Sequence, residues 1–268
     1  MAFYTDITLG KYYASDSWVH ALDPRTKLTS LMGLMVCLLI TLRPPMLIFF
    51  GIFALISIRA ARLPLALVLR NLRPFTWLFV ITVLVHVLWT HGEIAYRVPW
   101  IGLAISHEGL LLGFVYSMRL ALLVVYAAIL TLTTLPIEIA DALESIFSPL
   151  ERLQVPTHEM VMMLTLSLRF IPTLMEEAQR IKNAQISRGA TFEGNILEKV
   201  KSVVPLILPL FVSAFRRADD LALAMDSRCY SGGKGRSRYK SLHFDGKDYV
   251  VLTGTLLLML VIILVEIG

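Results

Sequence analysis

Cysteine is scarce in this sequence, with two residues among 268. Cys37 lies in an apolar run and Cys229 in a basic polar stretch, so we do not expect the two side chains to meet. Small secreted folds that depend on disulfides pair several cysteines. The sequence therefore excludes a disulfide framework as the basis of the fold.

Ionisable side chains are almost missing from the long apolar runs. The exceptions are His86, Arg119 and Glu266, and no carboxylate stands in the middle of a run. Carriers driven by ion gradients and most intramembrane enzymes need such groups inside the bilayer, so we do not expect a proton or sodium relay. Arg119 could line a substrate path, but we favour a structural role in which it snorkels or bonds a neighbouring carbonyl. His86 has the same two interpretations, and we favour simple packing or hydrogen bonding.

Catalytic and nucleotide-binding motifs are missing as well. Zinc-protease, serine-hydrolase and dinucleotide patterns do not occur, and Gly232–Ser237 lacks the spacing of a phosphate loop and follows a helical pattern instead of a strand. We therefore expect no catalytic residue, metal or cofactor in this chain. If ATP drives it, a partner subunit must hold the ATP and magnesium.

Apolar residues, in contrast, are abundant. They make up 56% of the chain, and the mean hydropathy is +0.70, which is too high for a protein surrounded only by water. The lipid bilayer is therefore an expected partner, and the net charge of +5 indicates cytoplasmic loops instead of nucleic-acid binding. We predict an all-α integral membrane protein with about five transmembrane helices, at Leu28–Leu42, Met46–Ile58, Phe75–Trp89, Leu110–Leu132 and Val250–Ile267.

Basic residues give an expected orientation. The segment between the second and third predicted helices holds four arginines and no acidic residue, which places it in the cytoplasm together with the N-terminus. Segment Thr90–Gly109 has one arginine and two glutamates and is expected outside. The four arginines are Arg59, Arg62, Arg70 and Arg73.

A charged segment separates the fourth predicted transmembrane helix from the last. We predict three parts: residues 1–134 with the first four helices, a cytoplasmic helical domain over 135–248, and the final helix over 249–268. Within the middle part, Pro136 begins a short helix that ends near Phe147. Two long helices follow, from Thr157 to about Arg188, with Glu176 and Arg180 as an i,i+4 pair, and from about Asn195 to Arg228.

The two long helices end in similar triplets. Ser187-Arg188-Gly189 closes the first and Ser227-Arg228-Cys229 closes the second. An arginine fork beside a small residue suits a groove on a partner protein. Alternatively, each arginine only complements its helix dipole, and Gly189 is an ordinary left-handed cap.

Several motifs resemble the T component of energy-coupling factor transporters. They are Asp23–Lys27, Ser167–Leu174, the two arginine triplets and Gly235–Tyr239, in an element order that also matches. The chain is most similar to the shared subunit that serves many vitamin uptake systems. This resemblance implies a non-catalytic coupling subunit in a bacterial cell membrane that works with two ABC-type ATPases and a membrane-embedded S component.

In that family the triplets read Ala-Arg-Gly, and each arginine docks into one ATPase. The resemblance assigns this role to Arg188 and Arg228, beside Ser187, Gly189, Ser227 and Cys229. Cysteine disfavours the positive backbone angle that glycine accepts, so we expect another cap or altered docking at Cys229.

An apolar stretch inside the second long helix, Val203–Ala214, is a candidate contact for the S component or the membrane edge. Its members are Pro205, Leu206, Pro209, Leu210 and Phe211, and the two prolines should kink the helix. Packing within the helical domain's own core is the alternative. For the whole chain, the competing functions are a self-sufficient secondary transporter or channel and a small membrane enzyme.

Overall fold

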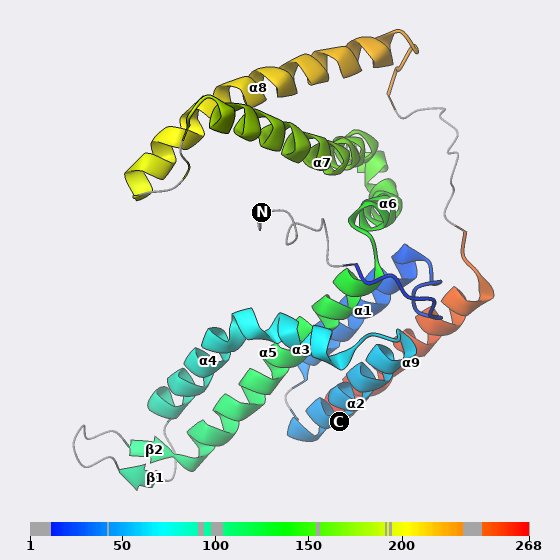
Figure 1. Cartoon of the computed structure of the whole chain (residues 1–268). Coiled ribbons are helices and arrows are strands. Elements are labelled where there is room, and N and C mark those ends of the chain that lie inside the picture. Colours follow the sequence, from blue (N-terminus) through cyan, green and yellow to red (C-terminus); the bar gives the residue numbers. More distant parts are fainter. Residues whose placement is uncertain are drawn as a thin grey trace. The chain divides into compact units, whose positions relative to one another are not determined.

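A computed structural model describes residues 12–41, 43–90, 94–97, 104–153, 156–190, 192, 195–232 and 243–267 (Figure 1). Nearly every described element is helical. The helices are α1 (Pro24–Ile40), α2 (Pro44–Ala60), α3 (Leu65–Leu72), α4 (Thr76–Trp89), α5 (His107–Thr133), α6 (Pro136–Phe147), α7 (Thr157–Ser187), α8 (Ile196–Asp226) and α9 (Gly246–Ile267), with short 3-10 helices η1 (Arg73–Phe75) and η2 (Ser148–Leu153).

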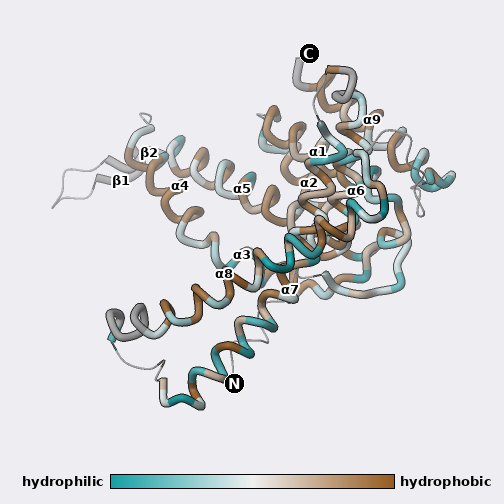
Figure 2. The backbone as a smooth tube through the Cα atoms, turned by 90° about the horizontal axis from the view of Figure 1, so that it is seen from above, coloured by the Kyte–Doolittle hydropathy of each residue, from teal (hydrophilic) through white to brown (hydrophobic). Residues whose placement is uncertain are grey.

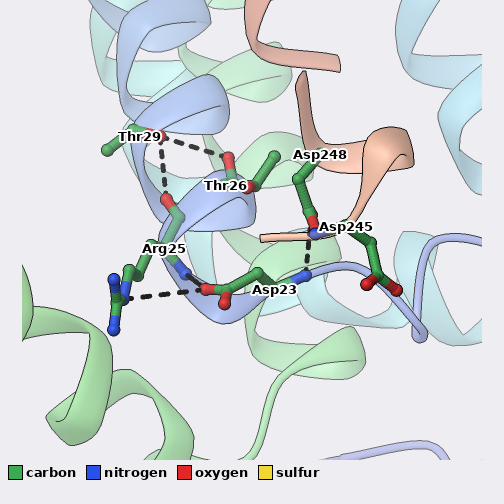
Figure 3. A network of polar contacts seen from close by, with 6 residues as sticks. All are labelled: Asp23, Arg25, Thr26, Thr29, Asp245 and Asp248. Carbon is green, nitrogen blue, oxygen red and sulfur yellow. Dashed lines mark hydrogen bonds and ion pairs between the residues drawn. The ribbon is translucent and has the colours of Figure 1, made fainter. Parts of the chain in front are cut away.

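Side-chain caps begin two helices of the apolar part, α1 and α5. The Asp23 carboxylate accepts a hydrogen bond from the Arg25 backbone N–H at 2.8 Å, and Pro24 supplies the fixed first-turn angle of α1 (Figure 3). In α5 the Ser106 hydroxyl accepts from the Gly109 N–H at 3.1 Å. At both helix starts, a local side chain therefore satisfies one of the backbone N–H groups that the helix leaves free.

The chain divides into two compact units, residues 1–142 with 240–268, and residues 143–239. In the first unit α5 packs against α1, α2, α3 and α4, and α9 packs against α1. Tyr126 of α5 lies in the centre, fully buried, and its hydroxyl donates to the Phe50 carbonyl at 2.8 Å. Figure 2 shows hydrophobic residues along much of α4 and α5 and mixed character along α7.

Two glycines bring α4 and α5 into close contact. A Cβ added to Gly109 would lie 2.7 Å from the His86 carbonyl oxygen, and one on Gly113 would lie 3.1 Å from Val83 Cα. Their spacing of four residues is the one that lets membrane helices approach backbone to backbone.

Three helical stretches are long and apolar enough to cross a membrane: Leu65–Trp89, His107–Thr133 and Gly246–Val265. The α2 helix is a shorter apolar helix, and α1 has 17 residues. The all-helical class and membrane character are confirmed in this coarser form. The count of five transmembrane helices stays a prediction, as does the division at residues 134 and 248.

The structure refines three details of the prediction. The helix predicted at Phe75–Trp89 corresponds to α4, which begins at Thr76, but α3 and η1 lead into it and place Arg70 and Arg73 within one continuous helical stretch. Two short strands that were not predicted, β1 (Ile94–Arg97) and β2 (Ala104–Ser106), pair antiparallel between α4 and α5. Finally, Arg180 pairs with Glu177 at 3.6 Å, one turn back, instead of with Glu176.

Two of the three ionisable side chains within the predicted transmembrane helices, Arg119 and His86, have structural partners. Arg119 is buried, donates to the Thr41 carbonyl and lies over the Tyr116 ring. The His86 ring lies 2.9 Å from the Thr82 carbonyl of its own helix and stacks on the Tyr116 ring, with 4.7 Å between ring centroids. The favoured interpretation of both residues, packing and carbonyl bonding, is confirmed.

Candidate functional site

The end of α7 forms a complete Schellman cap. Gly189 has a φ of +89°, its N–H donates to the Ile186 carbonyl at 2.9 Å, and the Ala190 N–H donates to the Gln185 carbonyl at 3.0 Å. These are the two bonds that define the motif. They leave Arg188 as the last residue before the reversal, with its side chain exposed.

The end of α8 forms the same cap with a different residue. Cys229 has a φ of +55°, its N–H donates to the Asp226 carbonyl at 2.9 Å, and the Tyr230 N–H donates to the Met225 carbonyl at 3.1 Å. Arg228 is exposed in the position that Arg188 holds on α7. We call the two helix ends, Ser187–Gly189 and Ser227–Cys229, the tips. Both tips place an arginine at the same position of the same type of cap.

Of the two alternatives expected at Cys229, another cap does not occur, and altered docking stays a prediction. The left-handed conformation costs a non-glycine residue about 1–2 kcal/mol, yet the two cap hydrogen bonds form at Cys229 as they do at Gly189. Among the described residues, Arg62 also adopts this conformation without being glycine (φ +52°), and α2 ends there with the same pair of bonds. The low preference of cysteine for a positive φ is thus outweighed by the hydrogen bonds that satisfy the carbonyl groups at the helix end.

The small residues of the triplets bond to their own helices. Ser187 donates to the Asn183 carbonyl at 3.1 Å, and Ser227 donates to the Ala224 carbonyl at 3.0 Å. Because both hydroxyls are bonded to their own helices, the exposed guanidinium of the neighbouring arginine is the group that can reach a partner.

The two tips lie at opposite ends of a helix pair. The α7 and α8 helices pack against each other, and Figure 1 shows α8 running back from the end of α7. Gly232, just beyond the second tip, lies near the start of α7, because a Cβ on it would be 3.5 Å from the Glu159 Oε1. One α8 helix of 31 residues separates the tips, a length of about 46 Å at 1.5 Å per residue. The structure therefore does not bring Arg188 and Arg228 together, and each would meet a different surface.

The candidate contact residues of α8 divide between two faces. Leu206 and Leu210 are half-buried, whereas Pro205, Pro209 and Phe211 are exposed. Both prolines lie inside α8, which continues without a break to Asp226.

An exposed apolar face of α8 was only partly named from the sequence. Helical spacing extends it beyond Phe211 and beyond Ala214, and Phe211 and Phe215 contact each other at 4.5 Å between ring centroids. A helical-wheel count of residues 203–215 could have found it. Its exposed members besides Phe211 are Val203, Val204, Ile207, Leu208, Val212 and Phe215.

Metal ligation finds no support in the described part of the chain, where no three His, Cys, Asp or Glu side chains form a cluster. The motif Gly235–Tyr239 lies outside the described residues, and so do Gly233 and Lys234 of the glycine-rich segment.

Comparison with known proteins agrees with the motifs. The family model CbiQ, described as "Cobalt transport protein", matches residues 15–239. Three similar proteins are each named "Energy-coupling factor transporter transmembrane protein EcfT". The protein from Thermanaerovibrio acidaminovorans is 47% identical over 94% of this chain and 93% of its own length. The one from Heliobacterium modesticaldum is 50% identical over 92% of both chains. The one from Bacillus subtilis is 40% identical over 93% of this chain and 94% of its own.

Near-complete coverage at this identity, together with the paired helix tips, assigns the chain to the family of transmembrane components of energy-coupling factor transporters.

Proposed function

We propose that this chain is the non-catalytic coupling subunit of an ATP-driven importer of vitamins or other micronutrients. Arg188 and Arg228 each dock into one of two ABC-type ATPases, which bind ATP and magnesium. The α7 and α8 helices pass the movement of the ATPases to a membrane-embedded S component that holds the substrate. The chain crosses a bacterial cell membrane several times, with its N-terminus and coupling helices in the cytoplasm.

The observation that carries this proposal is the cap geometry that the two tips share. Two helix ends far apart in one unit expose the same side chain on the same pair of cap hydrogen bonds. A cation that only complements a helix dipole needs no such repetition, since any position in the last turn serves. Two similar surfaces on two related partners would explain it.

Purification with partners tests the proposal directly. The tagged chain, extracted gently from its native membranes, should carry two ABC-type ATPases and one or more small membrane proteins, and the sample should hydrolyse ATP. A solitary polypeptide that moves a solute after reconstitution would contradict the proposal and favour the secondary transporter or channel.

The exposed apolar face of α8, residues 203–215, is the proposed contact for the S component. Leu208 and Phe211 have 69% and 58% of their surface exposed, so serine at either position changes the face without opening the α7–α8 contact. We expect Leu208→Ser and Phe211→Ser each to weaken capture of the S component about 30-fold, the effect of losing about 2 kcal/mol at an interface hot spot.

Leu223→Ser is the matched control for this experiment. Leu223 is 68% exposed on the same helix but lies outside the apolar face. Capture of the S component should survive this change. If capture also survives the double variant Leu208→Ser/Phe211→Ser, the face has another role.

A further inference from the structure

The beginning of α1 forms hydrogen bonds with two parts of the chain that are distant from each other in sequence. The chain passes from α5 through Thr133 and Thr134 into α6, leaves the first unit within α6 after Ala142, and returns to this unit ahead of α9. These two stretches are the roots of the segment that carries both arginine tips. Each of them is bonded to residues between Asp23 and Lys27.

The root at α9 is bonded through Asp248, whose side chain is buried. One carboxylate oxygen accepts from the Asp23 N–H at 2.9 Å, and the other accepts from the Asp245 N–H at 2.9 Å (Figure 3). Asp23 is the N-cap of α1, and Asp245 immediately precedes α9. A single carboxylate therefore joins the beginnings of two helices, through a bond between residues that are 225 positions apart. Arg25 adds a second link, because its guanidinium lies 5.3 Å from the ring centroid of Phe244.

The root at α5 is bonded through Lys27, which is 3% exposed. Its ammonium group donates to the Thr133 carbonyl at 3.2 Å and to the His20 carbonyl at 2.9 Å. Thr133 is the last residue of α5, where carbonyl groups lack helical partners and favour a cation. The carboxylates whose charges act on the ammonium are Glu138, Asp23 and Asp248.

The segment before α1 adds bonds to the same end of the first unit. The Tyr13 N–H donates to the Leu132 carbonyl at 2.9 Å, and the Ser15 hydroxyl donates to the Ala61 carbonyl at 3.1 Å. Arg62 at the end of α2 donates to the Asp16 carbonyl at 3.1 Å. The ends of α2 and α5 and the beginnings of α1 and α9 are thus joined at one place.

Burial of these charges needs an explanation beyond stability. Removing an ammonium and two carboxylates from water costs several kcal/mol for each ion, and well-packed apolar residues often stabilise a protein as much or more. Charged groups that are bonded to particular backbone atoms favour one geometry over others. In any other geometry, buried polar groups would lose their hydrogen-bond partners.

We propose that Asp23, Lys27 and Asp248 form a clasp that holds the two roots of the coupling segment at a fixed separation. Lys27 and Asp248 are then positioning residues for coupling. Movement imposed on the tips turns the coupling helices about fixed roots instead of pulling the roots apart. This inference rests on the proposed coupling function.

The separation of the two roots can be measured in the assembled complex. Spin labels at Ile137→Cys in α6 and Val250→Cys in α9, both exposed positions in the first unit, report that distance in a background with Cys37→Ala and Cys229→Gly. The complex is purified with its ATPases and examined without nucleotide and with magnesium, ATP and vanadate. With the clasp intact, we expect one narrow distance distribution in both states.

Lys27→Met and Asp248→Ala should release the roots. The ATPases should still copurify and hydrolyse ATP, but the distance distribution should widen and its mean should shift when nucleotide is added. Asp248→Asn, which keeps one oxygen acceptor, should give an intermediate width and decides the matter if the alanine variant does not fold. Lys247→Met and Asp245→Ala are matched controls, because both side chains are exposed beside the clasp and Asp245 bonds to Asp248 through its backbone.

Three results would overturn the inference. Clasp variants that keep the distribution of the parent protein would show that the roots need no clasp, and widening that is identical with and without nucleotide would reduce the clasp to a structural role. Shifts of the same size in the control variants would mean that any change at this end of the unit loosens it. Failure of the parent chain to retain ATPases would instead contradict the coupling function. In that case, the distance distributions of the parent and the clasp variants without nucleotide would still show whether the clasp fixes the separation of the roots.

Discussion

Reversing the charge at both helix tips, in the variant Arg188→Glu/Arg228→Glu, should release both ATPases from the purified chain. Each guanidinium is exposed at the end of its helix, ready to donate several hydrogen bonds to carboxylates or carbonyls of a groove. Breaking a buried charged contact at an interface costs about 2–5 kcal/mol, and a loss of 2 kcal/mol weakens binding about 30-fold. Quantifying the ATPases that copurify measures the effect.

The single variants sharpen this test. Because the tips lie at opposite ends of the α7–α8 pair, Arg188→Glu should lose one ATPase and Arg228→Glu the other. Arg180→Glu and Arg216→Glu are matched controls on α7 and α8, away from the tips. Retention of both ATPases by the double variant would contradict docking through the arginines.

Valine at Gly113 should separate α4 from α5. The added Cβ would meet Val83 Cα at 3.1 Å and the Val83 carbonyl oxygen at 3.2 Å, and backbone cannot move aside as a side chain can. Overpacking of this kind costs about 1–3 kcal/mol. Since α4 packs mainly on α5 and most of its side chains are exposed, little else holds α4 in place. Unfolding of the detergent-solubilised chain, followed by circular dichroism, measures the change.

Gly254→Val is the control for Gly113→Val. Nothing lies within 4 Å of a Cβ added to Gly254 in α9, another apolar helix of the same unit. We expect a change in the free energy of unfolding of less than about 0.5 kcal/mol. Equal losses in both variants would mean that helix propensity, not the contact between α4 and α5, decides the effect.

Local signals in the sequence were enough to predict several helices. The start and end of α6 were predicted at Pro136 and Phe147, and α7 begins at Thr157 as expected. Proline at or just before a helix start is a strong signal because its ring fixes the backbone angle. The α3 helix was missed because its arginines suggested a loop, although long basic side chains can reach the edge of a bilayer from within a helix.

The candidate site was predicted from the sequence only in its residue types. The arginine triplets were found, but the shared cap geometry required the structure, because cysteine at the C-terminal position argued against it. The contact of Asp248 with Asp23 spans 225 residues. No periodicity or motif encodes a pair so far apart, so the clasp could not have been predicted.

The cap at Cys229 also gives the chain a built-in reporter. Cys229 is exposed beside Arg228, whereas Cys37, the only other cysteine of the sequence, is buried. A maleimide dye applied to the folded chain should therefore attach next to one tip and spare the other. Protection of that thiol in the complex would measure occupancy of the second tip in the unmodified sequence, independently of the first.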